Sequence, residues 1–204
     1  NDPSLNAFVA GGQRIYVNSG LINAADNANQ VQGVLAHELG HIVGGHSISI
    51  GQEYGRATKI TILSLLLGVA AAAAGAGDAA MAAMSLGQQV AYRSLLTYTR
   101  GQEATADAAG ASYLSKAGIS GRGSLEFFGK IQNLEFRYGY PHDDEAAYAS
   151  THPMSGERIA TLRDDYQKDA AWNNKPDPRL EQRCQRVKAK LYGYLAKPAD
   201  TLRH

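Results

Sequence analysis

The sequence predicts an α+β protein that is mostly helical and has a small β-sheet or hairpin near its N-terminus. Strand-forming residues flank a pair of glycines close to the start of the chain. Further along, several segments repeat apolar residues at helical spacing, and loops rich in proline, glycine and polar residues separate them. The 204 residues, 44% of them hydrophobic, suffice for one domain with a substantial core.

The first expected element is a hairpin within residues 6–20. Phe8 and Val9 favour one strand, residues 15–17 favour the other, and a Gly-Gly pair supplies the turn. A helix is then expected over residues 23–43, where Asn27 and Gln30 form a capping pair.

Residues 60–77 carry no charge and lead into a second apolar segment, 78–92. Alanine and glycine make up half of the charge-free run, so it is a weak candidate for a transmembrane helix. We expect a pair of buried or amphipathic helices over residues 60–91 that pack on the domain. The alternatives are a true membrane span and a hydrophobic hairpin that contacts a membrane surface or a partner protein.

Four further helices are expected from the periodicity and from the glycine and proline breaks. They cover residues 99–116, 124–136, 156–167 and 178–195. The segment 137–157 is expected to be a loop.

The segment "VLAHELGHIVGGHS" holds a pattern that is typical of a metal site. His37 and His41 are four residues apart, so a helix projects both imidazoles from one face, about 40° apart. Glu38 lies at the edge of that face, where its carboxylate can take a proton from a metal-bound water. This His-Glu-x-x-His arrangement predicts one zinc ion per chain with Glu38 as general base.

His46 is a further candidate ligand, but it lies about 140° around the helix from His41. Families that recruit a third histidine after this motif place it six residues beyond the second histidine, a position occupied here by Ser47. We therefore expect His46 to have a structural role.

Glu103 is the better candidate for the third zinc ligand, because it lies on another predicted helix and leaves the fourth position open. Asp107 is on the same helix face and can accept the free N–H of a ligating histidine. The alternative is that both are ordinary solvated residues. Cys184, in a charged helix, and His204, the last residue, are weak competitors.

The segment "STHPMSGERI" places His152 before a proline, which favours an extended backbone. His152 could donate to the oxyanion of the tetrahedral intermediate, or fill the open zinc position when substrate is absent. Arg158 could hold this loop by pairing with a carboxylate or with backbone carbonyls. The alternative is an ordinary turn with His152 exposed. His142 has only a loop context.

Four blocks in order, "NAFVAGGQRIYVNSGLI", "VLAHELGHIVGGHS", "YTRGQEATADAAGASYLSKAGI" and "STHPMSGERI", resemble the catalytic domain of the HtpX-like, CAAX-prenyl-endopeptidase-type zinc metallopeptidases. The resemblance covers about residues 5–165 and is nearest to the periplasmic, BepA-like branch. Members of that branch continue into a tetratricopeptide-repeat domain, and no such repeat is visible here.

The resemblance implies a zincin fold of the gluzincin type. His37, His41 and Glu103 would bind zinc, Glu38 would be the base and His152 would lie on a mobile loop near the metal. Phe8 and Val9 would form the edge strand to which a substrate backbone pairs. It also implies a single metallopeptidase domain over 1–204, with its core at 5–167, a helical hairpin inserted at 60–91 and a C-terminal helical extension at 168–204.

The expected function is therefore zinc-dependent endopeptidase activity on unfolded or misassembled cell-envelope proteins, a protein quality control linked to outer membrane assembly. The expected location is the periplasm or cell envelope of a Gram-negative bacterium, although no signal peptide opens the chain. The net charge of +1 and the scattered basic residues argue against a nucleic-acid partner. The alternatives are a latent or chaperone-like zinc-binding module closed by His152, and a protein associated with a membrane through residues 60–91.

Overall fold

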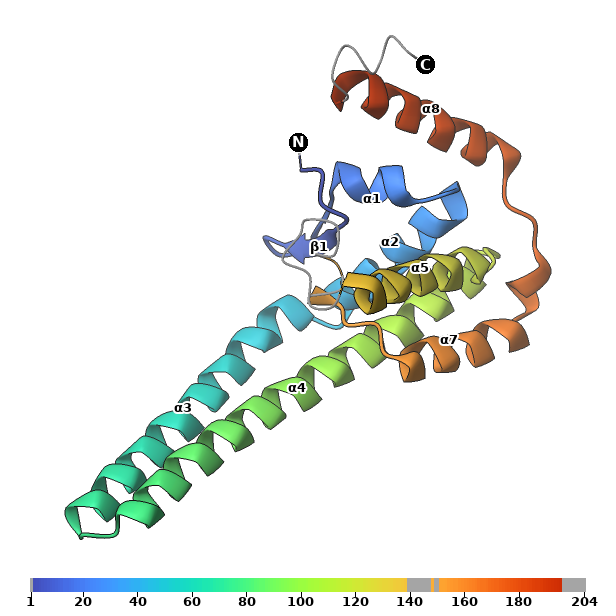
Figure 1. Ribbon diagram of the computed structural model, residues 1–204. Coiled ribbons are helices and arrows are strands. Elements are labelled where there is room, and N and C mark those ends of the chain that lie inside the picture. Colours follow the sequence, from blue (N-terminus) through green and yellow to red (C-terminus); the bar gives the residue numbers. More distant parts are fainter. Residues whose placement is uncertain (1, 139–147, 149–150, 196–204) are drawn as a thin grey trace. The chain divides into compact units, whose positions relative to one another are not determined.

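The computed structural model describes residues 2–138, 148 and 151–195 (Figure 1). Within it the chain forms two compact units. The first combines Asn1–Ile42 with Thr105–His204, and the second is Val43–Ala104. The expected single domain over 1–204 stays a prediction.

The first unit opens with the predicted hairpin. Strands β1 (Ala7–Ala10) and β2 (Arg14–Val17) pair antiparallel in a two-stranded sheet. Gly11 and Gly12 in the turn have φ of 59° and 93°, a left-handed region that strains any residue with a side chain. The predicted class, mostly helical with a small N-terminal sheet, is confirmed.

Seven helical segments follow or flank this hairpin among the described residues of the first unit. They are α1 (Ser19–Ala24), α2 (Ala28–Val43), the C-terminal part of α4 (Gly77–Lys116), α5 (Arg122–Tyr138), α7 (Gly156–Lys168), η2 (Ala170–Asn173) and α8 (Pro178–Leu195). The single helix expected over 23–43 is therefore wrong in its first part. Residues 25–27 break it into α1 and α2.

The break is explained by hydrogen bonds that cap α2. The Asn27 side chain accepts from the Gln30 N–H at 3.0 Å, and the Gln30 side chain accepts from the Asp26 N–H at 2.8 Å. A third cap comes from α8, where Glu181 accepts from the Ala28 N–H at 2.8 Å. This backbone bond is the main reason why the pKa of Glu181 lies below its ordinary value.

Helix α2 lies unusually close to its neighbours in the core of the first unit. A Cβ added at Gly33 would lie 2.6 Å from the Ser124 Cα of α5, and one added at Gly40 would lie 2.6 Å from the Ala106 carbonyl oxygen of α4. The stretch of α2 that carries the His-Glu-x-x-His pattern is therefore buried on the side that faces α4 and α5. The surrounding core contains Leu5, Ala7, Leu21, Ala25, Val34, Ala36, Leu114, Phe127, Phe128, Ile131, Tyr148, Met154, Leu162 and Tyr166.

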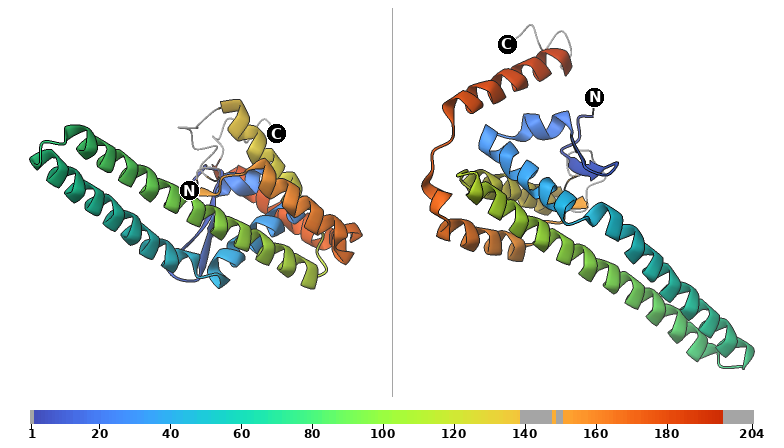
Figure 2. Two further views of the ribbon diagram at one scale, coloured as in Figure 1. Left: turned by 90° about the horizontal axis from the view of Figure 1, so that it is seen from below. Right: turned by 180° about the vertical axis from the view of Figure 1, so that it is seen from behind.

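The second unit is a long antiparallel hairpin made of α3 (His46–Ala73) and the part of α4 that precedes Thr105 (Figure 2). The separation expected between the helical pair over 60–91 and the helix over 99–116 is wrong, because α4 runs without interruption from Gly77 to Lys116. Among the described residues, α3 is the one helix that is both long and apolar enough to cross a membrane.

Of the two forms expected for the helices of residues 60–91, buried or amphipathic, the buried form is wrong. The two helices meet at the small residues Ser64, Gly68 and Gly87. A Cβ added at Gly87 would lie 2.0 Å from the Ser64 Cβ, and a Cβ added at Gly68 would lie 2.6 Å from the Met84 Cγ. Most of the larger apolar side chains point away from this contact. The exposed ones are Ile62, Leu63, Leu65, Leu66, Leu67, Val69, Met81, Leu86, Val90 and Tyr92.

Candidate metal centre

Helix α2 presents His37 and His41 one turn apart on its buried face. Their Nε2 atoms lie 3.0 Å apart, and both side chains are more than nine-tenths buried. Two donor nitrogens in van der Waals contact, shielded from water, are an arrangement that a shared cation stabilises.

Asp107 orients the first of these rings. Its Oδ1 lies 2.8 Å from the His37 Nδ1, on the side of the ring opposite Nε2. A carboxylate in this position holds the proton on Nδ1, so the Nε2 lone pair faces the other ligands. The edge of the Phe128 ring packs against His37, with the ring centroids 5.6 Å apart.

Arg158 in turn holds Asp107. Its Nε and Nη2 donate to the two carboxylate oxygens of Asp107 at 2.7 and 2.9 Å, and its Nη1 donates to the Pro153 carbonyl at 2.7 Å. Burial raises the pKa of Asp107, but the hydrogen bonds and charges of His37 and Arg158 outweigh burial and bring that pKa below its ordinary value. Asp107 is therefore ionised and able to accept the His37 proton.

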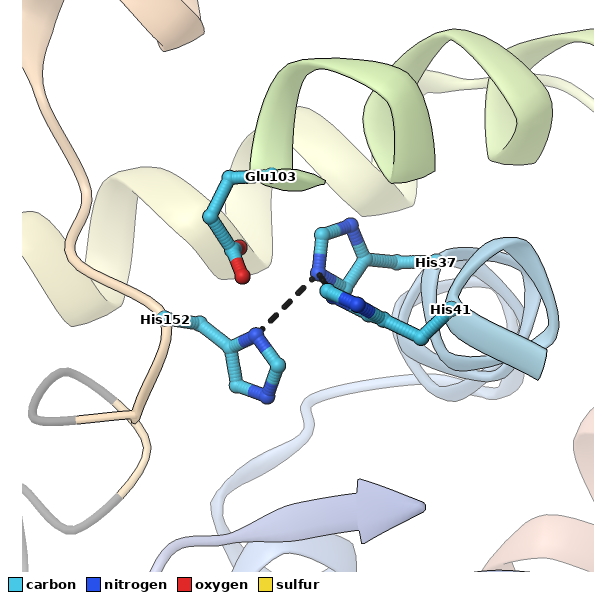
Figure 3. A group of neighbouring side chains, drawn as sticks. All are labelled: His37, His41, Glu103 and His152. Atoms are coloured by element: carbon cyan, nitrogen blue, oxygen red, sulfur yellow. Dashed lines mark hydrogen bonds between the residues drawn. The ribbon is translucent and has the colours of Figure 1, made fainter. Parts of the chain in front are cut away.

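Glu103 lies one turn before Asp107 in the uninterrupted helix α4, so helix geometry fixes its place relative to that residue. It is buried, and one of its carboxylate oxygens belongs to a group with one ring nitrogen each from His37, His41 and His152. All four atoms lie within 4.8 Å of one another (Figure 3). The alternative that Glu103 is an ordinary solvated residue is wrong, because its side chain is buried.

His152 enters this group from the segment before α7. Its backbone N–H donates to the Tyr148 carbonyl at 2.7 Å, and its side chain is buried rather than exposed. The Nδ1 atom of His152 lies 3.4 Å from the His37 Nε2 (Figure 3). His152 thus occupies a place where a fourth ligand of the same cation would be.

These residues fit a zinc ion by donor type and by spacing. Two donors about 2.0–2.1 Å from a tetrahedral zinc are separated by about 3.3 Å. The nitrogen separations of 3.0 and 3.4 Å around His37 are close to that distance. Three imidazoles and one carboxylate are also ligands that zinc prefers.

Glu38 lies beside this group and is fully buried. Its Oε1 is 3.5 Å from the His152 Nε2 and accepts from the Tyr148 hydroxyl at 3.4 Å. His152 therefore faces the ligand group with one ring nitrogen and the carboxylate of Glu38 with the other. Sequence analysis missed Tyr148, and its place four residues before His152 was the only available signal.

The other candidates are not members of this group or lie outside the described residues. His46 is the first residue of α3 and is not among the four clustered residues, and Cys184 is in α8. Phe8 and Val9 are on β1, and the Leu5 carbonyl just before that strand accepts from the Tyr148 N–H at 3.0 Å. His142 and His204 lie outside the described residues.

The chain is similar to several proteins with protease names over about four-fifths of its length. It is 32% identical over 169 residues to a Vibrio cholerae protein whose name places it among the beta-barrel assembly-enhancing proteases, covering 80% of this chain and 33% of that protein. It is 26% identical over 174 residues to the beta-barrel assembly-enhancing protease of Escherichia coli K12, covering 80% of this chain and 32% of that protein. With metalloprotease LoiP of the same organism it shares 30% identity over 160 residues, covering 78% of this chain and 58% of LoiP.

The chain spans about one third of the length of the first two of these relatives. The profile of peptidase family M48 matches residues 1–165, which include every residue of the group described above. The chain therefore belongs to peptidase family M48.

Proposed function

We propose that this protein is a zinc-dependent endopeptidase. The observation that carries the proposal is the buried group of His37, His41 and Glu103 with Glu38 beside it. A zinc ion held there supplies Lewis-acid chemistry, which polarises the scissile carbonyl and makes water a stronger acid.

The side chains around the ligands supply proton transfer, positioning of the base and stabilisation of the transition state. Glu38 takes the proton of the attacking water and passes it to the leaving amine, which its buried carboxylate can do without competition from solvent. Tyr148 positions that carboxylate through its hydroxyl. His152, once swung away from His37, donates to the oxygen that becomes negative in the transition state.

The proposed substrates are unfolded or misassembled proteins of the cell envelope, and the proposed location is the periplasm or envelope of a Gram-negative bacterium. Support comes from the names of two bacterial relatives, which describe proteases that enhance beta-barrel assembly. We also propose that Phe8 and Val9 of β1 form the edge to which an extended substrate pairs, because unfolded chains have free backbone groups for such pairing. Among the described strands, β1 pairs with β2 alone.

Replacement of the base tests the proposal. Glu38→Gln should keep the zinc content near one ion per chain, because Glu38 is not among the clustered ligands, and should lower cleavage of unfolded casein by at least about 100-fold. Both are measured on the same purified sample. Peptide hydrolysis at the wild-type rate in Glu38→Gln would refute the proposed mechanism.

One observation favours a second candidate function, a latent zinc-binding module. The Nδ1 atom of His152 lies 3.4 Å from the His37 Nε2, within the group of possible ligands, so the protein would supply four ligands to a bound zinc ion. In this arrangement no position is open for substrate or water, and the protein would need a signal that moves His152.

The two candidates predict opposite effects of replacing His152. If His152 closes the site, His152→Ala should raise the rate of casein cleavage several-fold. If His152 stabilises the transition state, the same change should lower kcat by about 10- to 100-fold with little change in KM. His46→Ala is the matched control, because His46 is not in the ligand group, and it should leave the rate unchanged.

A further inference from the structure

The second unit carries an apolar surface that the proposed peptidase chemistry does not use. Leu63, Leu65, Leu66 and Leu67 are all exposed by about half or more. They fall within five consecutive positions, and at about 100° per residue they spread over most of the circumference of α3. A helix that is apolar nearly all round is suited to a hydrocarbon environment, whereas a helix that packs on one protein surface needs only an apolar stripe.

The contact between α3 and α4 is also of a kind found in a hydrocarbon environment. Ser64 and Gly68, four residues apart, meet Gly87 and Met84 of α4 closely. Small residues at a spacing of four let helix backbones approach without burying large apolar side chains, as in membrane-embedded helix pairs. The hairpin therefore keeps its two helices together while its leucines face outward.

Charged residues mark how far this apolar surface extends. Between Lys59 and Arg93 the only charged residue is Asp78, at the start of α4 near the tip of the hairpin. Because Gly87 lies opposite Ser64 in an antiparallel pair, the residue opposite Lys59 is Tyr92. Lys59, Tyr92 and Arg93 are all exposed and lie at one level of the hairpin.

This level has the composition of a membrane interface. Tyrosine and basic side chains gather where a membrane protein passes from hydrocarbon to headgroups, and the basic ones are attracted by anionic lipids. Arg56 and Arg100, further from the tip, are also exposed and add positive charge on the same side. Glu53 offsets part of it, but that carboxylate accepts from the Ser94 hydroxyl at 2.9 Å and is mostly buried.

We propose that the α3–α4 hairpin inserts tip first into a lipid bilayer that contains anionic lipids, with Lys59, Tyr92 and Arg93 at the headgroups. The charge-free stretch of each helix, residues 60–73 of α3 and 79–92 of α4, is about 21 Å long. This is shorter than the hydrocarbon core of a bilayer, which is about 30 Å thick. The hairpin therefore enters from one side and ends inside the bilayer. This inference does not rest on the proposed peptidase function.

Vesicle binding of the whole chain tests the proposal. The wild-type protein should float with vesicles of phosphatidylethanolamine and phosphatidylglycerol. The triple variant Leu63→Asn, Leu66→Asn, Leu67→Asn should bind at least about 100-fold more weakly, since three exposed leucines lose their lipid contacts. The variant should fold normally, as judged by its circular dichroism, because these leucines are exposed in water.

A matched control is available on α8, where Leu180, Val187 and Tyr194 are also exposed. Replacing these three by asparagine should leave vesicle binding within about 3-fold of wild type. A drop as large as that of the hairpin triple variant would mean that exposed apolar residues bind vesicles without specificity, and would overturn the proposal.

Two charge variants test the orientation. Lys59→Gln with Arg93→Gln should weaken binding to the anionic vesicles by about 10-fold and change binding to pure phosphatidylcholine little. Asp78→Asn should strengthen binding to both kinds of vesicle by about 10-fold, because an ionised carboxylate at the tip opposes insertion. Unchanged binding in Asp78→Asn would contradict the tip-first orientation.

Two results would overturn the membrane proposal as a whole. One is a wild-type protein that does not bind either kind of vesicle. The other is a concentration-dependent dimer in sedimentation, lost in the leucine triple variant, which would assign this surface to a second copy of the chain. Glu38→Gln should bind vesicles like wild type, so a failure of the peptidase proposal remains distinguishable from a failure of this one.

Discussion

At the scale of single residues, Arg158 connects the orientation of a metal ligand with the position of His152. Two of its nitrogens bind Asp107, which holds His37, and a third binds the carbonyl of Pro153, next to His152. A bidentate arginine fixes both partners in one geometry, which a lysine could not reproduce. A movement of His152 away from His37 that also displaces Pro153 would therefore break the contact between Arg158 and the Pro153 carbonyl.

Metal retention should depend on both carboxylates, Asp107 and Glu103. Asp107→Asn removes the charge that holds the His37 proton, and we expect zinc affinity to fall by about 10- to 100-fold. Glu103→Ala removes a ligand and should weaken retention by at least about 10-fold. Zinc content after dialysis against a graded series of chelator concentrations measures both effects.

The exposed acid Asp164 on α7 provides the control for these variants, because it pairs only with the exposed Lys168 among the described residues. Asp164→Asn should retain zinc like wild type. If Glu103→Ala also retained zinc like wild type, the assignment of Glu103 as a ligand would be wrong.

The sequence was informative about residues whose relation depends on one helix and uninformative about those brought together by folding. The spacing of His37 and His41, and that of Glu103 and Asp107, follow from helical periodicity. The contact between Tyr148 and Glu38 does not, because 110 positions separate them and the segment around Tyr148 has no periodic pattern. A residue of that kind becomes visible only when the chain is folded.

At the scale of elements, the position of α2 depends on close contacts that only glycine allows. Gly40→Ala should destabilise the protein by about 1–3 kcal/mol, because the new methyl would overlap the Ala106 carbonyl on α4. Urea unfolding measures this. Gly129→Ala in α5 is the control: nothing lies within 4 Å of its added Cβ, and it should stabilise by about 0.5–1 kcal/mol. Equal effects of both changes would contradict the packing described for α2.

Element boundaries were predicted well where a clear local signal ends the helix. The expected helix 178–195 matches α8, and the one expected over 156–167 differs from α7 by one residue. The hairpin was predicted less well because its helices lack such signals. Residues 92–98 were left out of the helical prediction, yet they continue α4 without a break. The leucine-rich run was expected in a buried or an amphipathic helix, whereas its leucines are exposed and the small residues beside them form the helix contact.

At the scale of the whole molecule, a buried tyrosine links stability to alkaline pH. Burial raises the pKa of Tyr166 from 10.0 to about 12, and its hydroxyl donates to Ser124 at 3.2 Å. The folded chain therefore keeps this proton at pH values where the unfolded chain loses it. The stability that depends on it is complete below pH 10 and is lost as the pH rises to about 12, by up to about 2–3 kcal/mol.

Tyr166→Phe should reduce this loss, because phenylalanine has no proton to release. The free energy of unfolding, measured in urea between pH 9 and about 11, should then fall less steeply than in wild type. Tyr194→Phe is the control, since Tyr194 is exposed and should leave the slope unchanged. Parallel pH profiles for Tyr166→Phe and wild type would show that Tyr166 does not set the alkaline limit.

The sole tryptophan of the chain, Trp172, lies under Arg122, whose guanidinium carbon is 4.0 Å from the ring centroid. Both residues belong to the first unit, and residues 43–104 contain no tryptophan. Tryptophan fluorescence therefore reports the unfolding of the first unit and gives no signal from the helical hairpin. Comparing that signal with far-ultraviolet ellipticity, which sees both, would reveal whether the hairpin melts together with the rest or as an independent cooperative block.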